Sequence, residues 1–318
     1  MLKHLFFYGY QWRRTVRRHL KKYYSPDKPK SNSLEKTVIC MADGKLRHGG
    51  LADRIRSYVT YYNFCKSHNL RFAINFTFPF RLEDYLEPNI YDWRLRPGEL
   101  TYNSSEARPL PFSTSGPLTK FEIKKQRQLV EKYVGRGRLK QYHIYSNFCF
   151  YDDNFGKCFH ELFRPVPRIA KAVEECKKEI GGKYISVATR FLELLGDFKE
   201  PKDRMHLSEE GKEELIRRCM HELNNIHKQY PNHTILVTSD SMLFLDSCRN
   251  LPFVYIPSGT IKHLDLAGTG DHAKTFIDFL LISEADKVFQ IKVAPMYEGN
   301  FSLRAAQVGE KPYQLIEA

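Results

Sequence analysis

The chain has 318 residues, of which 42% are apolar and 27% are charged. This composition is ordinary for a globular protein and excludes collagen, coiled coil and a wholly disordered chain. Lys and Arg outnumber Asp and Glu by 50 to 37, so the net charge is +13, which favours an anionic partner such as a phosphorylated small molecule, nucleic acid or a membrane surface.

The first predicted region, residues 1–36, is a basic N-terminal segment followed by a linker. The basic run RRTVRRHLKK comes after a short apolar patch, whereas a signal peptide places its charges before its apolar run. As a helix this segment is basic and amphipathic, which is typical of peripheral membrane association. A terminal helix packed on the body is the alternative. The apolar residues available to an interface are Leu5, Phe6, Tyr10 and Trp12.

The region 37–165 is predicted to be an α/β domain. TVICMA (37–42) and RFAINF (71–76) have strand composition, and the apolar residues between them recur at helical spacing. Strand, helix and strand in this order indicate a parallel βαβ unit. From 79 onward prolines interrupt the pattern, which predicts long loops around a helix at 121–134 and a strand at 141–151.

The region 166–318 alternates helix and strand more regularly, which predicts a doubly wound parallel sheet. Ser208 is a plausible N-cap for a long helix, and Gly181 and Gly182 end the helix before it. Ligands of such sheets bind beyond the carboxyl ends of the strands, so the loops after the strands are the candidate sites. The predicted strands are 183–189, 233–241, 253–257, 287–292 and 312–318.

The first candidate site is the loop RHGGLADR, in which Gly49 and Gly50 lie between a strand and a helix. Backbone N–H groups and the helix dipole can meet a phosphate there. This spacing is neither GxGxxG nor a P-loop, so a tight turn is an equally good interpretation.

The second candidate is Arg190, which directly follows the apolar strand YISVAT. Arginine at this position can bind a pyrophosphate through paired hydrogen bonds. Glu193 and Asp197 follow it, and either can serve as a general base. The alternative is a surface arginine beside solvated acids.

Two more strand ends carry hydroxyl and carboxylate groups. Asp240 and Ser241 follow a strand, where they can meet a guanine base or act as helix N-caps. Ser302 lies near the start of the last helix, where it can hold a phosphate or serve as a cap.

Taken in order, these segments resemble the motifs of the GT-B GDP-fucose fucosyltransferases, the superfamily of α1,2-, α1,6- and protein O-fucosyltransferases. GGLADRIRSYV resembles their N-terminal glycine motif, YISVATR their H-x-R motif and VTSDS their T-D-D turn. IDFLLISEADKVF followed by FSLRAAQVG resembles their last motif, which is the most specific match. The chain is most similar to bacterial surface-polysaccharide members.

The resemblance implies two Rossmann-like α/β domains facing a cleft. Residues 37–165 are then the acceptor side and 166–318 the donor side. The implied donor contacts are Gly49, Gly50, Arg190, Asp240, Ser241, Phe301 and Ser302.

The chain departs from the family pattern next to the arginine. Ala188 stands where the family has histidine, and Phe191 where a second arginine is usual. These differences leave the role of Arg190 intact but leave the base open among Glu193, Asp197 and Asp53.

The implied activity is metal-independent, inverting transfer of fucose from GDP-fucose to a glycan acceptor, with no bound cofactor, in surface-polysaccharide or glycoconjugate synthesis. The alternatives are another nucleotide-sugar transferase or an inactive carbohydrate-binding protein on the same fold. Nucleic-acid binding is disfavoured because the densest charge lies in one terminal segment. Seven cysteines without a CxxC pair indicate free thiols in a reducing compartment, so we expect a cytoplasmic protein, peripheral at the inner membrane face if the basic segment binds lipid.

Overall fold

The structure is a computed structural model, and it divides the chain into two compact units. The N-terminal unit consists of the chain up to Gly49, Asp53–Leu82 and Pro88–Arg164. The C-terminal unit consists of Gly50–Ala52, Glu83–Glu87 and Pro165–Ala318. The residues that the structure describes are 15–112, 120–147, 150, 154–198, 205–259 and 270–318.

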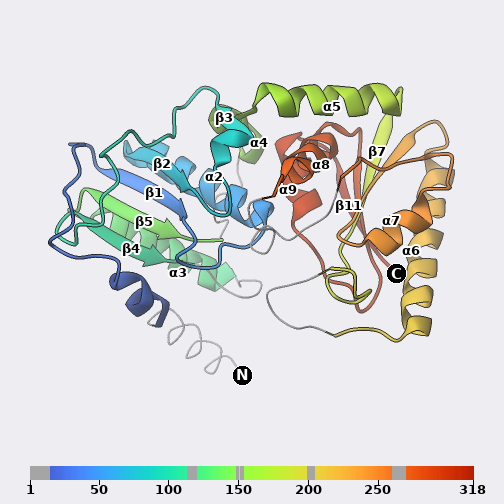
Figure 1. The fold of residues 1–318 in the computed structure, drawn as a ribbon, viewed down its shortest axis with the longest axis horizontal. Coiled ribbons are helices and arrows are strands. Elements are labelled where there is room, and N and C mark those ends of the chain that lie inside the picture. The colour runs from blue at the N-terminus through green and yellow to red at the C-terminus, as the bar shows by residue number, and fades with distance from the viewer. Residues whose placement is uncertain (1–14, 113–119, 148–149, 151–153, 199–204, 260–269) are drawn as a thin grey trace. The chain divides into compact units, whose positions relative to one another are not determined.

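A four-stranded parallel sheet forms the centre of the N-terminal unit (Figure 1). Its order is β2-β1-β5-β4, and α2 (Leu51–His68) connects β1 to β2. All six residues of β1 are buried, as a parallel strand covered on both faces requires. The predicted βαβ unit is therefore confirmed. The strands are β1 (Thr37–Ala42), β2 (Arg71–Phe76), β4 (Ala107–Pro111) and β5 (Gln141–Tyr145).

The remaining elements of the first half are mostly short. The predicted helix 121–134 corresponds to α3 and η2, and the predicted strand 141–151 is shorter and ends at Tyr145. β3 and β6 pair as a separate two-stranded sheet. Sequence analysis missed the helix α4 and the strands β3, β4 and β6. The short elements are η1 (Leu82–Asp84), β3 (Leu86–Pro88), α3 (Lys120–Val130), η2 (Glu131–Gly135), α4 (Phe155–Leu162) and β6 (Phe163–Pro165).

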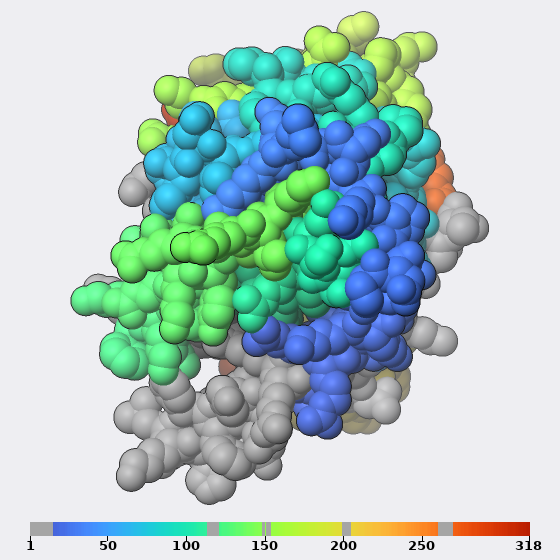
Figure 2. Space-filling model, turned by 90° about the vertical axis from the view of Figure 1, so that its left-hand side faces the viewer, coloured from blue at the N-terminus to red at the C-terminus, as the bar shows by residue number. Residues whose placement is uncertain are grey.

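The described part of the N-terminal segment packs on the N-terminal unit. Residues 15–21 are helical, and Leu20 is fully buried in a cluster with Ile39 and Tyr145. The stretch 25–36, predicted to be a linker, is held instead by side chains of the body. Figure 2 shows blue N-terminal residues lying directly against the teal and green ones of this unit. The predicted interface residues Leu5, Phe6, Tyr10 and Trp12 lie outside the described residues.

Three buried side chains satisfy the backbone of this stretch. The Asn103 amide donates to the carbonyls of Pro26 and Lys28, both at 2.7 Å. The Thr101 hydroxyl donates to the Pro29 carbonyl, and Glu106 accepts the Ser31 N–H. These contacts are long-range in sequence, which is why composition alone suggested a linker.

The C-terminal unit has a five-stranded sheet in the order β11-β10-β7-β8-β9, and every pair is parallel. The central strand β7 is buried along its whole length. The predicted parallel sheet is therefore confirmed. The strands are β7 (Tyr184–Thr189), β8 (Thr234–Thr238), β9 (Val254–Tyr255), β10 (Val288–Lys292) and β11 (Tyr313–Glu317).

Helices cover both faces of this sheet, with α6 and α7 on one side and α8 and α9 on the other (Figure 1). Ile185 and Val187 of β7 pack against Leu215 and Leu223 of α6. The Ser208 side chain accepts the Gly211 N–H, so the predicted N-cap is confirmed. The helices are α5 (Pro167–Ile180), α6 (Glu209–Gln229), α7 (Met242–Cys248), α8 (Ala273–Glu284) and α9 (Phe301–Val308).

Among the described residues, no helix combines the length and the apolar character that a membrane span needs.

Candidate active site

Arg190 begins the loop at the carboxyl end of β7, the central strand of the C-terminal sheet. Its Nη1 lies 3.2 Å from Asp240 Oδ2, and its Cζ lies 5.0 Å from the centre of the Phe198 ring. The side chain is 29% exposed, so the guanidinium is held by these contacts while part of it still faces solvent. Such a half-buried arginine is well placed to bind an anion.

The start of α9 lies against Arg190. A Cβ built on Gly299 would lie 3.5 Å from Arg190 Cγ and 3.7 Å from Gln290 Nε2, so the backbone just before the helix runs close to the arginine stem. The first N–H groups of an α-helix lack partners within the helix, and its dipole favours negative charge there. Arg190 and the α9 start therefore combine two features that attract a phosphate.

Ser302 lies in the first turn of α9, and Asn300 rather than Ser302 is the N-cap residue. The buried Ser302 hydroxyl donates to Gln290 Oε1 at 3.2 Å, and Tyr313 donates to the same oxygen at 2.7 Å. The Phe301 ring packs edge-on against Phe279 at 5.3 Å, so the Phe301 side chain belongs to the packing between α8 and α9. Gln290 thus fixes the first turn of the helix against the sheet.

Asp240 lies at the carboxyl end of β8 and is 5% exposed. Its Oδ1 accepts the Phe191 N–H and its Oδ2 the Leu192 N–H, both at 2.8 Å. Burial raises the pKa of Asp240, and the Arg190 charge and these two N–H groups oppose that rise. Asp240 is therefore a buried carboxyl group whose contacts all point to the loop after β7.

That loop has an unusual backbone. Leu192 has φ 58°, in the left-handed region that residues with a side chain rarely adopt. The conformation costs ~1–2 kcal/mol for an L-residue. The Asp240 hydrogen bond to Leu192 N is one interaction that offsets this cost.

A hydrogen bond between Ser241 and Asp197 makes a second connection between the loop after β8 and the loop after β7. The Ser241 hydroxyl donates to Asp197 Oδ2 at 2.8 Å and accepts the Phe244 N–H at 3.2 Å. Asp197 Oδ2 also accepts the Leu243 N–H at 2.9 Å. Ser241 is therefore the N-cap of α7, the alternative that spacing alone favoured, and Asp197 supports it. Glu193 is buried in the same loop.

Gln290 and Gly299 were not predicted as site residues, whereas Ser239 was part of the predicted VTSDS turn without a role of its own. Ser239 accepts from the Thr189 hydroxyl at 2.9 Å and from the Ser241 N–H at 3.1 Å. A buried polar residue inside the apolar run KVFQIK was the available signal for Gln290. Gly299 carried no signal, because its proximity to Arg190 depends on a strand that is distant in sequence.

The loop that contains Gly49 and Gly50 belongs to the N-terminal unit as far as Gly49. Gly49 has φ +75°, and a Cβ there would lie 2.6 Å from Asp53 Oδ2. Asp53 also pairs with Arg56 at 2.9 Å. Gly50 has no described heavy atom within 4 Å of such a Cβ, so its surroundings are open. Gly49 is thus required by local geometry, whereas Gly50 leaves the backbone accessible.

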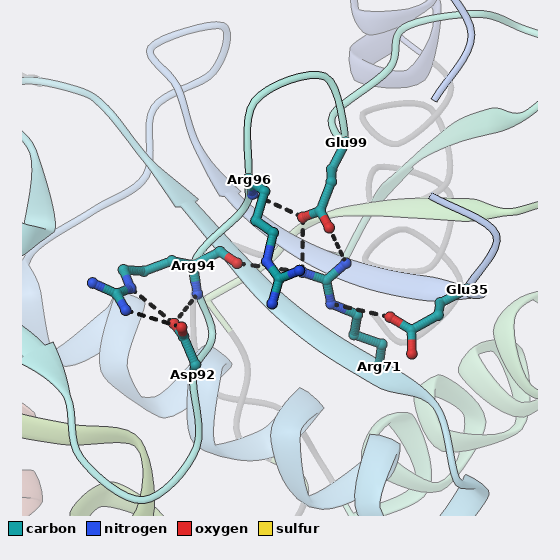
Figure 3. Close-up of a pocket in the computed structure, with 6 residues that line it drawn as sticks. All are labelled: Glu35, Arg71, Asp92, Arg94, Arg96 and Glu99. Atoms are coloured by element: carbon teal, nitrogen blue, oxygen red, sulfur yellow. Dashed lines mark hydrogen bonds and ion pairs between the residues drawn. The ribbon is translucent and has the colours of Figure 1, made fainter. Parts of the chain in front are cut away.

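A pocket of about 290 Å³ opens on the N-terminal unit (Figure 3). Arg71 pairs with Glu99 through two hydrogen bonds of 2.9 and 2.8 Å, and Arg94 pairs with Asp92 at 2.8 and 2.9 Å. Arg71 is the first residue of β2, so the pocket lies at the amino end of the sheet, away from the edge where parallel sheets bind ligands. We assign it a structural role. It is lined by Glu35, Arg71, Asp92, Arg94, Arg96 and Glu99.

In the part of the chain that the structure describes, no three His, Cys, Asp or Glu side chains gather as a metal site.

No protein-family model matches the sequence, and no curated protein matches it. Solved structures do match. NodZ α-1,6-fucosyltransferase soaked with GDP-fucose superposes with a TM-score of 0.55 at 12% identity, over 86% of this chain and 92% of that one. The chain has the fold of these fucosyltransferases. NodZ from Bradyrhizobium without a stated ligand gives 0.54 at 13% identity, over the same shares of both chains.

A mutant of Arabidopsis thaliana FUT1 in complex with GDP gives a TM-score of 0.54 at 13% identity, over 95% of this chain and 78% of that one. The predicted α/β fold of GT-B type is therefore confirmed. Identities this low establish the fold, and the activity is argued from the site.

Proposed function

We propose that this protein is an inverting fucosyltransferase that moves fucose from GDP-fucose to a glycan acceptor. The observation that carries the proposal is the position of Arg190 beside the start of α9, at the carboxyl end of β7. The shared fold supports it, because the NodZ structure was soaked with GDP-fucose and the FUT1 structure contains GDP. A half-buried guanidinium and helix N–H groups suit a diphosphate.

In this reaction an acceptor hydroxyl attacks the anomeric carbon of fucose while the bond to the β-phosphate oxygen breaks. GDP leaves with the electron pair, and the hydroxyl proton passes to a base or to water. A β-linked donor then gives an α-glycoside. Arg190 stabilises the charge that develops on GDP, which is the step where an electrostatic donor helps most.

The remaining predicted residues take roles around this centre. Phe301 and Ser302 contribute backbone N–H groups of the first turn of α9, and Gly50 contributes accessible backbone to the donor. Asp240 and Ser241 lie at the end of β8, on the donor side of the C-terminal unit. Glu193 and Asp197 are the predicted bases, and Asp197 accepts hydrogen bonds from the Ser241 hydroxyl and the Leu243 N–H.

The acceptor side and the membrane are further parts of the proposal. The N-terminal unit binds the glycan acceptor, and the role is in surface-polysaccharide or glycoconjugate synthesis in the cytoplasm. The helix 15–21 buries Leu20, while Arg18, Lys21 and Lys22 on or directly after it are exposed. This exposed basic face suits an anionic membrane surface. Cosedimentation with vesicles containing phosphatidylglycerol, against neutral vesicles, tests this part.

The central test is ligand-induced thermal stabilisation. A ligand that binds only the native state raises the melting temperature by mass action. We expect GDP and GDP-fucose to raise it with EDTA present, and ADP and UDP to have smaller effects. Stabilisation by UDP alone, or loss of the GDP effect in EDTA, contradicts the proposal.

A further inference from the structure

We propose that Asp240 is a positioning residue that holds the β7–α6 loop, and with it the Arg190 guanidinium, in the orientation that receives the donor diphosphate. This inference rests on the proposed function. It assigns Asp240 to the protein's own loop rather than to the guanine base suggested by its sequence position.

The contacts of Asp240 carry the inference. Oδ1 accepts the Phe191 N–H, and Oδ2 accepts the Leu192 N–H and lies 3.2 Å from Arg190 Nη1. Three consecutive residues are therefore bound by one carboxylate. Hydrogen bonds to an ionised acceptor are about twice as strong as neutral ones, so this group is well suited to fix a loop.

The loop geometry explains why such an anchor is needed. Leu192, two residues after Arg190, is held at φ 58°. A conformation of this kind persists only where the surroundings determine it. If Leu192 relaxed toward the right-handed region, the chain direction after Arg190 would change and the guanidinium would move relative to the α9 start.

The connection is reciprocal. Asp240 comes from the loop after β8 and binds the loop after β7, while Asp197 comes from the loop after β7 and binds Ser241 at the end of the loop after β8 and the Leu243 N–H in the first turn of α7. Each loop is thus anchored by a carboxylate from the other. Arg190 is fixed before the donor arrives, and electrostatic catalysis requires this kind of preorganisation.

The test compares Asp240→Asn with Asp246→Asn as a matched control. Asp246 lies on α7 and forms an exposed pair with Arg249 at 2.7 Å, so the control makes the same chemical change away from Arg190. Both changes are made in the wild-type and the Arg190→Ala backgrounds. The readouts are GDP release from GDP-fucose with water as acceptor, GDP affinity, melting temperature and amide hydrogen exchange of residues 190–198.

The expected result is a loss of GDP release of about 10- to 100-fold in Asp240→Asn, as small misplacements of catalytic groups produce. The loss should disappear in the Arg190→Ala background, because Asp240 acts through Arg190. Exchange at Phe191 and Leu192 should rise. Asp246→Asn should behave as wild type in every readout.

Other outcomes overturn the inference. Losses that add in the double variant, or Asp240→Asn release equal to that of Asp246→Asn, show that Asp240 does not act through Arg190. If Asp240→Asn unfolds at the assay temperature, Asp197→Asn loosens the same loop from its other end, and its loss must likewise vanish in Arg190→Ala. A wild-type protein that binds no GDP overturns the proposed function, and this inference with it.

Discussion

Asp197 accepts the Ser241 hydroxyl at 2.8 Å, and the same carboxylate oxygen accepts the Leu243 N–H. Ser241 in turn caps α7. A carboxylate that the sequence offered as a general base is therefore part of the anchoring of a helix. General base and support of the α7 N-cap are two roles for Asp197 that an experiment can distinguish.

Asp197→Ala should lower stability and leave the pH dependence of GDP release unchanged in shape. Loss of a helix-capping interaction costs ~1 kcal/mol. We expect a lower melting temperature and a pH profile of GDP release with the same shape as wild type, because removal of a general base would delete one limb of that profile. Loss of the acid limb in Asp197→Ala would make Asp197 the base after all.

Arg190→Ala should reduce fucose transfer or GDP-fucose hydrolysis by ~100-fold or more, the usual cost of removing one electrostatic donor to a developing charge. Arg190→Lys should recover only part, because an ammonium lacks the planar fork that pairs with two oxygens. Steady-state kinetics beside melting temperatures provide the measurement. A folded Ala variant with near wild-type turnover would remove Arg190 from the mechanism.

Gly49→Ala and Gly50→Ala form a matched pair. Gly49→Ala places a Cβ 2.6 Å from Asp53 Oδ2 at φ +75°, and should cost ~1 kcal/mol or more. Gly50→Ala meets open space and should leave stability within ~0.5 kcal/mol of wild type. Because we propose that the Gly50 backbone contacts the donor, its variant should show a smaller GDP-induced shift in melting temperature. An unchanged shift in Gly50→Ala argues against that contact.

His143 should make the protein acid-sensitive. It is fully buried, and burial lowers its pKa from 6.5 to about 3. Its Nε2 lies 3.1 Å from Gln141 Oε1 and its Nδ1 2.6 Å from the Tyr24 hydroxyl, which fits a neutral ring with the proton on Nε2. The unfolded chain therefore binds one more proton between these two pH values.

The stability that this neutral ring contributes is present above pH 6.5 and falls as the pH drops toward 3, by at most ~1.4 kcal/mol per pH unit. Urea unfolding at several pH values measures it. His143→Gln should flatten this part of the pH dependence. An equally steep dependence in that variant would assign the acid lability to other groups.

Most of the fold could be predicted from the sequence because the signals for its strands and helices are local. The apolar run YISVAT predicted β7, Ser208 predicted the start of α6, and Gly181, with φ 74°, ends α5. Each depends on residues within one turn or one strand. The segment 25–36 had no such signal, since its hydrogen bonds go to Thr101, Asn103 and Glu106.

The candidate site was likewise predicted only in part from the sequence. The sequence by itself determined that Arg190 follows an apolar strand and that Ser302 lies near the start of the last helix, because strand and helix ends can be predicted from local periodicity. Only the tertiary structure decided that Asp240 binds the loop after Arg190 and that Asp197 supports α7. Those contacts join residues more than 40 positions apart, and a carboxylate's role depends on which N–H groups the packed sheet brings within about 3 Å of it.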